Sequence, residues 1–252
     1  MEPILKVSDL TKTFEDRRKE KFCAVDHVSF QVMKGQTLGI VGESGSGKST
    51  LAKLLCRLEE PTGGTIQLCG QEIGKQKGKK NREMYRKIQM VFQDPVSSFD
   101  LRRTLGEGIG ESLRNTGMSR KEAEKQAEHL LDQCGLPAAF AKRYPHEVSG
   151  GQCQRAAIAR ALAIEPEILI CDEATSALDV TVQKQIMELL DMLRKEKHLT
   201  ILFICHNLAL VQSFCDRVFV MKEGKMIEEG TSDDVILQPK HAYTKLLVDS
   251  VL

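Results

Sequence analysis

Short apolar runs separated by turn residues dominate the start of the chain. Three of them are rich in β-branched residues and predict strands: Ile4–Val7, Val28–Val32 and Thr37–Val41. A helix is expected to begin at Lys48 and to continue to about Leu58, because residues 60–64 (EPTGG) would end it. The run Thr65–Leu68 predicts a further strand.

The pattern becomes helical between about Thr104 and Ala163. Ser119 and Glu122 form a capping-box pair, which predicts the start of a helix. Gly135 predicts its end, since glycine commonly follows the last turn. This helical stretch separates two parts of the chain that are rich in strands.

Strands and helices alternate again in the second half. Two apolar runs predict buried strands: Ile168–Cys171 and Thr200–Cys205. The segment between them carries apolar residues at helical spacing: Ile186, Leu189, Leu190 and Leu193. Two further runs, Arg217–Met221 and Lys225–Glu229, predict a hairpin around residues 222–224 (KEG). This alternation predicts an α/β fold with a mostly parallel sheet covered on both faces.

Composition and charge narrow the class of protein. The chain has 252 residues, of which 41% are hydrophobic and 28% charged, so a disordered chain is excluded. Its 36 basic and 35 acidic residues give a net charge of +1, so no nucleic-acid partner is expected. No apolar run approaches the roughly 18 residues of a membrane span. The N-terminus has no signal-peptide pattern, and a soluble protein of the cytosol is expected.

The cysteines and one basic segment do not indicate a further catalytic or metal site. None of the eight cysteines forms a C-x-x-C pair, so we expect reduced, mostly buried side chains and no zinc site. Residues 75–87 carry seven basic side chains, which predict a solvated loop and helix face. The alternative is a contact with acidic loops or lipid headgroups.

Residues 42–49 match the P-loop pattern G-x-x-x-x-G-K-[ST]. The candidate nucleotide-binding residues here are Gly42, Glu43, Ser44, Gly45, Ser46, Gly47, Lys48, Ser49 and Thr50. Glycines let backbone N–H groups curl around phosphates, and the helix that follows adds its positive end. Lys48 is expected to reach the β- and γ-phosphates, and the Ser49 hydroxyl to bind Mg²⁺.

Two carboxylates end the strand predicted at residues 168–171. Asp172 is expected to hold Mg²⁺ through water. Glu173 is expected to act as the catalytic residue that polarises the attacking water. Carboxylates are expected at this place, because α/β sheets bind ligands at the carboxyl ends of their strands. Together with the P-loop, they predict a nucleoside triphosphatase.

A third motif narrows the prediction. Residues 148–152 (VSGGQ) resemble the LSGGQ signature of ATP-binding cassette (ABC) proteins, with valine in place of the first leucine. The signature residues are Ser149, Gly150, Gly151 and Gln152. Ser149 follows Ser49 by 100 residues, which is the size of the family's helical insertion. The resemblance implies that this segment binds the ATP held by a partner subunit.

Further residues match the family in order along the chain. Gln93 resembles the Q-loop glutamine, which joins Mg²⁺ and the attacking water to the membrane partner. Residues 176–179 (SALD), which end at Asp179, resemble the D-loop at the dimer seam. His206 resembles the switch histidine that contacts the γ-phosphate. Phe14 resembles the aromatic residue that stacks on adenine, with Phe22 as the competitor.

The resemblance covers Leu5 to Leu247 and implies one ABC ATPase domain over residues 1–252. It implies a P-loop fold with a RecA-like, mostly parallel core, an antiparallel β subdomain and an α-helical subdomain. The expected division is about 1–98 and 165–230 for the ATP-binding core with the β subdomain, 99–164 for the helical subdomain, and 231–252 for a tail.

More narrowly, the chain resembles the ATPases of peptide and nickel importers. Three stretches carry that resemblance: residues 88–98 (IQMVFQDPVSS), 144–152 (YPHEVSGGQ) and 238–247 (QPKHAYTKLL). Ala242 replaces the proline of the family's H-P-Y-T tail, and residues 100–102 (DLR) replace a frequent N-P-R. The chain ends soon after this tail, without a Cys-bearing extension, which favours a nickel-type or other short member.

The implied activity is hydrolysis of ATP with Mg²⁺, which Ser49, Gln93 and Asp172 would hold. Two ATPase subunits, identical or different, would close head to tail around two ATPs and move separate permease subunits. An extracytoplasmic solute-binding protein would take part indirectly. The implied location is the cytoplasmic face of the cell membrane, as a peripheral subunit.

Other functions remain as alternatives. Another ABC transporter, importing a different solute or exporting one, is the nearest. Translation-associated ABC proteins carry two cassettes, and chromosome-associated ones have a long coiled coil before the signature, so both are disfavoured. A P-loop kinase would leave the signature and His206 unexplained. A binding module without hydrolysis would lack Glu173 or His206, and both are present.

Overall fold

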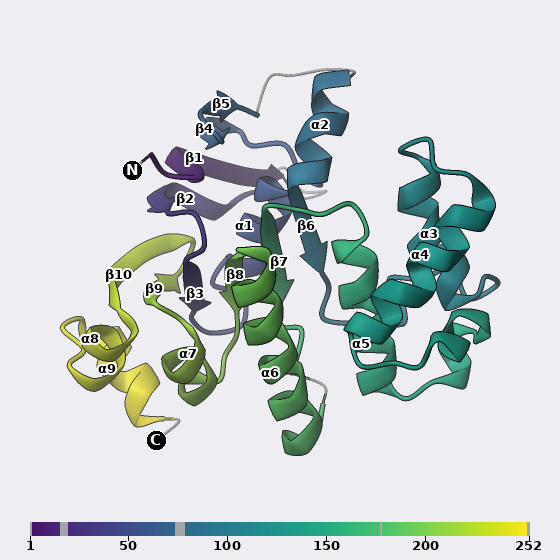
Figure 1. Cartoon of the computed structure of the whole chain (residues 1–252). Helices are drawn as coiled ribbons and strands as arrows, with labels where there is room; N and C mark the ends of the chain where they lie inside the picture. The colour runs from purple at the N-terminus through teal and green to yellow at the C-terminus, as the bar shows by residue number, and fades with distance from the viewer. Residues whose placement is uncertain (1, 16–19, 74–78, 177, 251–252) are drawn as a thin grey trace.

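The computed structural model describes residues 2–15, 20–73, 79–176 and 178–250. Two sheets and two groups of helices make up this part of the chain (Figure 1). Figure 1 shows the helices α3, α4 and α5 gathered on one side of the larger sheet, away from the antiparallel strands near the N-terminus. The expected three-part architecture is therefore observed.

The larger sheet has six strands in the order β10-β9-β3-β8-β7-β6. Its strands are β3 (Thr37–Val41), β6 (Ile88–Val91), β7 (Ile168–Asp172), β8 (Thr200–Ile204), β9 (Arg217–Lys222) and β10 (Lys225–Thr231). All pairs are parallel except β9 with β10. The hairpin turn between these two is confirmed, with positive φ at Glu223 and Gly224.

Alternate residues of these strands enter two separate hydrophobic clusters. In β7, Ile168 and Ile170 belong to the cluster that contains α1 and the antiparallel strands. Leu169 and Cys171 belong to the cluster that contains the faces of α5 and α6. Because side chains alternate across a strand, this division shows that both faces of the sheet are covered, as the sequence predicts.

The second sheet is antiparallel and has the order β2-β1-β4-β5. Its strands are β1 (Leu5–Glu15), β2 (Lys21–Val32), β4 (Gly63–Leu68) and β5 (Gln71–Glu72). The first two are much longer than predicted, because their outer halves pair in a hairpin that sets Phe14 opposite Phe22. The outer halves, residues 11–15 and 21–23, are half-buried or exposed and contain no apolar run, so the sequence does not reveal the strands there.

Two helices flank the first part of the larger sheet. Helix α1 (Lys48–Leu55) begins where predicted but ends three residues early. The left-handed backbone of Arg57, with φ of 55°, breaks the helix before Leu58. Helix α2 (Lys79–Lys87) takes up most of the basic segment predicted as a loop and helix face. Residues 74–78 of that segment lie outside the described part.

The helical group consists of α3 (Leu105–Arg114), α4 (Arg120–Gln133), two short 3₁₀ turns and α5 (Gly150–Leu162). The turns are η1 (Ala138–Lys142) and η2 (Pro145–Glu147). Helix α4 confirms its prediction: Ser119 and Glu122 form both bonds of the capping box. Gly135 follows the helix with φ of 72°.

The remaining helices are α6 (Val180–Lys197), α7 (Leu208–Phe214), α8 (Ser232–Leu237) and α9 (Ala242–Asp249). The predicted apolar face of α6 is buried: Ile186, Leu189, Leu190 and Leu193. All eight cysteines are free thiols, and six of them are buried, as expected. Burial raises the pKa of the Cys56 thiol to about 12, which keeps it protonated and inert.

Candidate functional site

Four of the predicted site elements follow the carboxyl ends of four neighbouring parallel strands. The P-loop follows β3, His206 follows β8, Glu173 follows β7 and Gln93 follows β6. Since β3, β8, β7 and β6 are consecutive in the sheet, these four segments meet along one edge. Open α/β sheets bind ligands at this edge. The strand order therefore gathers residues that lie far apart in the sequence.

Two glycines of the P-loop are required by close backbone contacts. At Gly42, with φ of +148°, a Cβ atom would lie 2.2 Å from the carbonyl oxygen of Met221. At Gly47, with φ of +104°, it would lie 2.2 Å from the carbonyl oxygen of Ala24. Both substitutions would also be strained by the positive φ. The loop is thus fitted tightly between β2 and β9.

Lys48 is buried and its ammonium group donates hydrogen bonds within the P-loop. Its Nζ lies 2.7 Å from the carbonyl oxygen of Gly42, 2.6 Å from that of Glu43 and 3.1 Å from Ser46 Oγ. Burial lowers the pKa of Lys48, while the surrounding carboxylates oppose this shift. The lysine thus donates to oxygen atoms of its own loop. The charged oxygens of a phosphate would be stronger acceptors.

Ser49 and Asp172 meet between α1 and β7. The Ser49 hydroxyl donates to Asp172 Oδ1 over 3.1 Å. Burial raises the pKa of Asp172, while the hydrogen bond from Ser49 lowers it. A hydroxyl and a carboxylate oxygen side by side are ligands that Mg²⁺ prefers. The donor set of these two residues therefore fits Mg²⁺.

Glu173 leaves its strand in a left-handed conformation, with φ of 49°. Its backbone N–H still donates to the carbonyl oxygen of Ile204 in β8, over 2.9 Å. Its carboxylate accepts a hydrogen bond from Gln93 Nε2 at 2.8 Å. A non-glycine residue in this region is uncommon and marks a place where the surrounding structure holds the backbone in a costly conformation. The side chains of Glu173 and Gln93 are thus brought together by two adjacent strands.

Ser176, the first residue of the predicted D-loop, belongs to the same cluster, although the sequence assigned it no role at Glu173. Its hydroxyl accepts from Gln93 Nε2 over 3.4 Å and donates to the backbone carbonyl of Glu173 over 3.0 Å. It thereby braces the turn that carries the glutamate. Its place in the D-loop match, three residues after Glu173, is the sequence signal that points to it.

His206 is exposed in the turn between β8 and α7. Within the described part of the chain, its ring makes no hydrogen bond. Asn207 caps α7 through a hydrogen bond from the N–H of Leu210 to its Oδ1, over 3.2 Å. The cap orients the start of α7 and leaves the histidine free to face a ligand at the sheet edge.

The signature residues lie at the start of α5, in the helical group. Ser149 caps the helix by accepting from the N–H of Gln152, and Gln152 Oε1 accepts in return from the N–H of Ser149. Ser149 and Gly150 are exposed. A Cβ atom at Gly151 would lie 2.5 Å from Val182 in α6. A helix N-terminus with exposed serine and glycine is suited to bind an anion.

Asp179, predicted at the dimer seam, is the N-cap of α6. Its Oδ1 accepts from the backbone N–H of Val182 over 3.0 Å. Val180 beside it is 81% exposed, which is unusual for a valine at the start of a helix. Residue 177, in the predicted D-loop, lies outside the described part of the chain.

Phe14 and Phe22 face one another across the hairpin of β1 and β2. Phe14 is 37% exposed and has the ammonium of Lys12 over its ring at 4.7 Å. Phe22 is 62% exposed. Both rings are therefore exposed enough to stack on adenine.

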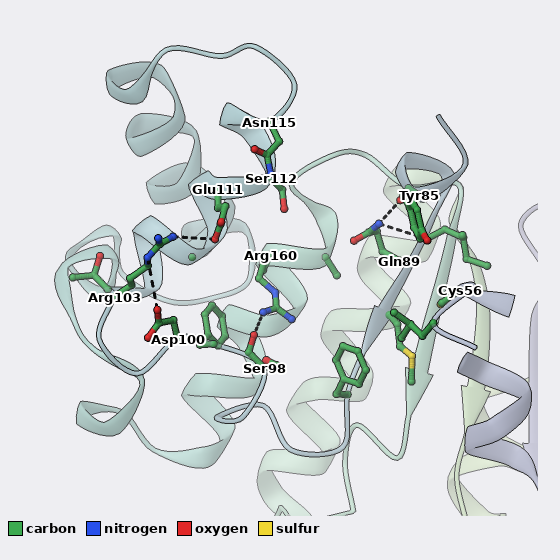
Figure 2. A pocket seen from close by; sticks show the side chains of 18 residues that line it. Cys56, Tyr85, Gln89, Ser98, Asp100, Arg103, Glu111, Ser112, Asn115 and Arg160 are labelled. Carbon is green, nitrogen blue, oxygen red and sulfur yellow. Dashed lines mark hydrogen bonds and ion pairs between the residues drawn. The ribbon is translucent and has the colours of Figure 1, made fainter. Parts of the chain in front are cut away.

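A pocket of about 380 Å³ lies between α2, β6 and the helical group (Figure 2). Apolar side chains of Met90, Phe92 and Phe99 line it. Figure 2 shows Arg160 of α5 pointing to the backbone of Ser98, with charged groups at one end of the pocket. The guanidinium of Arg160 also lies 4.7 Å from the ring of Phe99. Because Phe92 precedes Gln93, the pocket adjoins the loop that reaches Glu173.

Comparison with known proteins agrees with this geometry. Residues 25–176 match the ABC transporter family. The oligopeptide transport ATP-binding protein AppF of Bacillus subtilis is 46% identical, with 99% of this chain and 78% of the relative covered. The oligopeptide transport ATP-binding protein OppF of Escherichia coli is 43% identical, with 98% of this chain and 77% of the relative covered.

Solved structures show the same fold. The cassette MJ0796, captured as a dimer after hydrolysis with ADP and Pi bound, superposes with a TM-score of 0.83 at 31% identity. That match covers 90% of this chain and 98% of MJ0796. The protein cbiO1 from Clostridium perfringens, part of the transporter complex cbiONQ, has a TM-score of 0.81 at 30% identity, with 94% and 92% covered.

Among the helices of the described residues, none is both long enough and apolar enough to cross a membrane.

Proposed function

The chain belongs to the ABC transporter family and is an ATPase of that family, and on this premise we propose that it drives the uptake of peptides through a separate permease. The contact that carries the proposal is the hydrogen bond between Gln93 and Glu173, because it joins the candidate base to the loop beside the pocket. The relatives described above are oligopeptide transport proteins, which favours peptides over nickel as the solute.

The P-loop would bind the phosphates of ATP, and the residues that follow the strands would carry out hydrolysis. Backbone N–H groups of residues 44–50 would hold the phosphates, and Lys48 would exchange its loop carbonyls for phosphate oxygens. Glu173 would orient the attacking water and accept its proton. His206, on the neighbouring strand end, would contact the γ-phosphate.

Mg²⁺ would be held by Ser49 and Asp172, with Gln93 as a further ligand. When bound, it would neutralise charge on the phosphate oxygens. Asp172 is suited to this role because burial of its carboxylate raises its pKa and disfavours its ionised form. A cation would therefore relieve the cost of keeping it ionised.

Two ATPase subunits would close head to tail around two ATPs. The exposed Ser149 and Gly150 at the start of α5 would bind the ATP held by the P-loop of the partner subunit. The exposed Val180 beside Asp179 would be covered in such a dimer. ATP favours the closed state only through contacts made in that state. The partner subunit would be identical or a second ATPase.

A permease subunit would dock in the pocket between α2, β6 and α3. Its apolar floor and charged rim suit a short amphipathic segment. Closure of the dimer would then move the docked segment, since Gln93 links the pocket to the ATP site. Replacement of Ser112 on α3 by tryptophan should fill the pocket, abolish uptake and leave the ATPase of the isolated subunit intact. The chain would thus work as a peripheral subunit at the cytoplasmic face of the membrane.

The solute is tested by uptake of a radiolabelled dipeptide and of radiolabelled nickel in cells that carry Glu173→Gln. Loss of dipeptide uptake alone is the expected result. Loss of nickel uptake alone would contradict the peptide proposal and leave the ATPase assignment standing. Glu196→Gln, an exposed position on α6, is the matched control and should transport at the normal rate.

A further inference from the structure

The tail segment of residues 238–247 contacts the P-loop through Tyr243 of α9, although no role in the ATP site was assigned to it above. Helices α8 and α9 follow β10, and α8 packs against both α7 and α9 (Figure 1, yellow and green). Tyr243, in the first turn of α9, is 6% exposed. Its hydroxyl oxygen accepts a hydrogen bond from the backbone N–H of Glu43, over 3.0 Å. The two residues are 200 positions apart in the sequence.

The position of Tyr243 is fixed by its surroundings. The Nζ of Lys222, at the end of β9, lies 4.9 Å from the centre of the tyrosine ring. Glu228 of β10 accepts from the backbone N–H groups of Lys240 and His241, at 2.8 and 3.0 Å. His241 caps α9 by accepting from the N–H of Tyr243 over 3.1 Å. The tail therefore delivers the hydroxyl to the P-loop from a rigid frame.

Glu43 is held at both ends of its backbone. Its N–H donates to Tyr243, while its carbonyl oxygen accepts from Lys48 Nζ at 2.6 Å. Phosphates of bound ATP would draw Lys48 away from that carbonyl, because a charged oxygen is the stronger acceptor. The bond to Tyr243 does not involve the phosphates and can persist. It would then be the fixed anchor of the first half of the loop.

We propose that Tyr243 is a positioning residue of the ATP site: its hydroxyl holds the Glu43 peptide so that the P-loop keeps its phosphate-binding shape. The proposal rests on the assignment of residues 42–49 to ATP binding. The hydrolytic groups Glu173 and Gln93 follow β7 and β6, whereas Glu43 follows β3. The effect of Tyr243 is therefore on ATP affinity and not on the chemical step.

The test compares Tyr243→Phe with the wild-type chain. This variant keeps the buried ring and removes the hydrogen bond. The KM for ATP and the Kd for a fluorescent ATP analogue should rise about three- to tenfold, with kcat within about twofold. Tyr144→Phe, at an exposed tyrosine of the helical group, is the matched control and should change neither constant. A wild-type KM and Kd for Tyr243→Phe would overturn the proposal, as would a fall in kcat with no change in Kd.

A second variant separates the peptide from the side chain of Glu43, since its carboxylate also lies at the Tyr243 hydroxyl. In a Glu43→Gln background, Tyr243→Phe should raise the Kd by the same factor as in the wild type. Disappearance of the effect would assign it to the carboxylate and overturn the proposal. A wrong ATP-site assignment would be recognised by a different result. In that case Lys48→Ala would bind the analogue with the wild-type Kd, whatever the effect of Tyr243→Phe.

Discussion

The side-chain amide of Gln93 donates a hydrogen bond to the carboxylate of Glu173, with 2.8 Å between Nε2 and Oε2. The two residues follow neighbouring strands and are 80 positions apart in sequence. The bond holds one oxygen of the candidate base against the loop that adjoins the pocket. A movement of that loop would therefore change how Glu173 is oriented toward water.

Glu173→Gln should bind ATP but hydrolyse it at least about 100-fold more slowly, because an amide cannot accept the proton of the attacking water. Without hydrolysis, ATP should also hold two subunits together. Phosphate release and size-exclusion chromatography with and without ATP measure the two effects. Wild-type turnover would remove Glu173 as the base, and a kinase would show no ATP-dependent dimer.

Lys48→Ala should lose nucleotide binding, since it removes the ammonium that would contact the phosphates. Isothermal calorimetry with ATP measures the affinity directly. Lys53→Ala is the matched control, because Lys53 lies one turn further along α1 and is exposed. An unchanged affinity in Lys48→Ala would contradict the P-loop assignment.

Phe14→Ala should raise the KM for ATP by about fivefold or more, as loss of a base-stacking aromatic ring does elsewhere. Phe22→Ala should stay within about twofold of the wild type. Because the rings lie opposite one another on β1 and β2, the pair is matched in position. Steady-state kinetics with GTP as well as ATP would show whether the ring contacts the base. The reverse order of the two KM values would assign the stacking to Phe22.

Gly47→Ala should destabilise the fold by about 1–3 kcal/mol more than Gly117→Ala. Their backbones are alike, with φ of +104° and +101°. A Cβ atom at Gly47 would meet the carbonyl oxygen of Ala24, whereas at Gly117 it would meet nothing within 4 Å. Denaturant unfolding of both variants isolates the cost of the close contact from that of the positive φ. Equal losses of unfolding free energy in the two variants would show that the P-loop accommodates the Cβ atom at Gly47 without a measurable cost.

Asp172→Asn should raise the unfolding temperature of the nucleotide-free protein at neutral pH. Burial raises the pKa of Asp172, so the ionised carboxylate disfavours the folded state. This penalty is absent below the usual pKa, grows as the pH rises through the raised value and is full above it. The increase in unfolding temperature of Asp172→Asn over the wild type should therefore become smaller as the pH falls toward about 4.

Asp191→Asn is the control for this pH series. The ammonium of Lys195 lowers the pKa of Asp191, so ionised Asp191 favours the folded state and its loss should give no gain at neutral pH. Thermal unfolding followed by circular dichroism over this pH range measures both variants. A lower unfolding temperature for Asp172→Asn at neutral pH would contradict the sign of the prediction.

Local chemistry was readable from the sequence because it depends on neighbours along the chain. Ser119 and Glu122 specify the start of α4, and the turn at Glu223 and Gly224 specifies the hairpin. The loop of residues 42–49 carries its own glycines, lysine and serine, so the type of site was also predictable. The early end of α1 was not, since nothing in the residues near Arg57 signals a left-handed backbone.

Only the tertiary structure decided which distant residues touch. The order β3-β8-β7-β6 sets Gln93 against Glu173, and the path of the tail sets Tyr243 against Glu43. Strand order and the packing of a terminal helix depend on the summed burial of many side chains and on sheet register. No local pattern encodes that sum. The sequence therefore determined the chemical groups of this site, and the fold determined how they are joined.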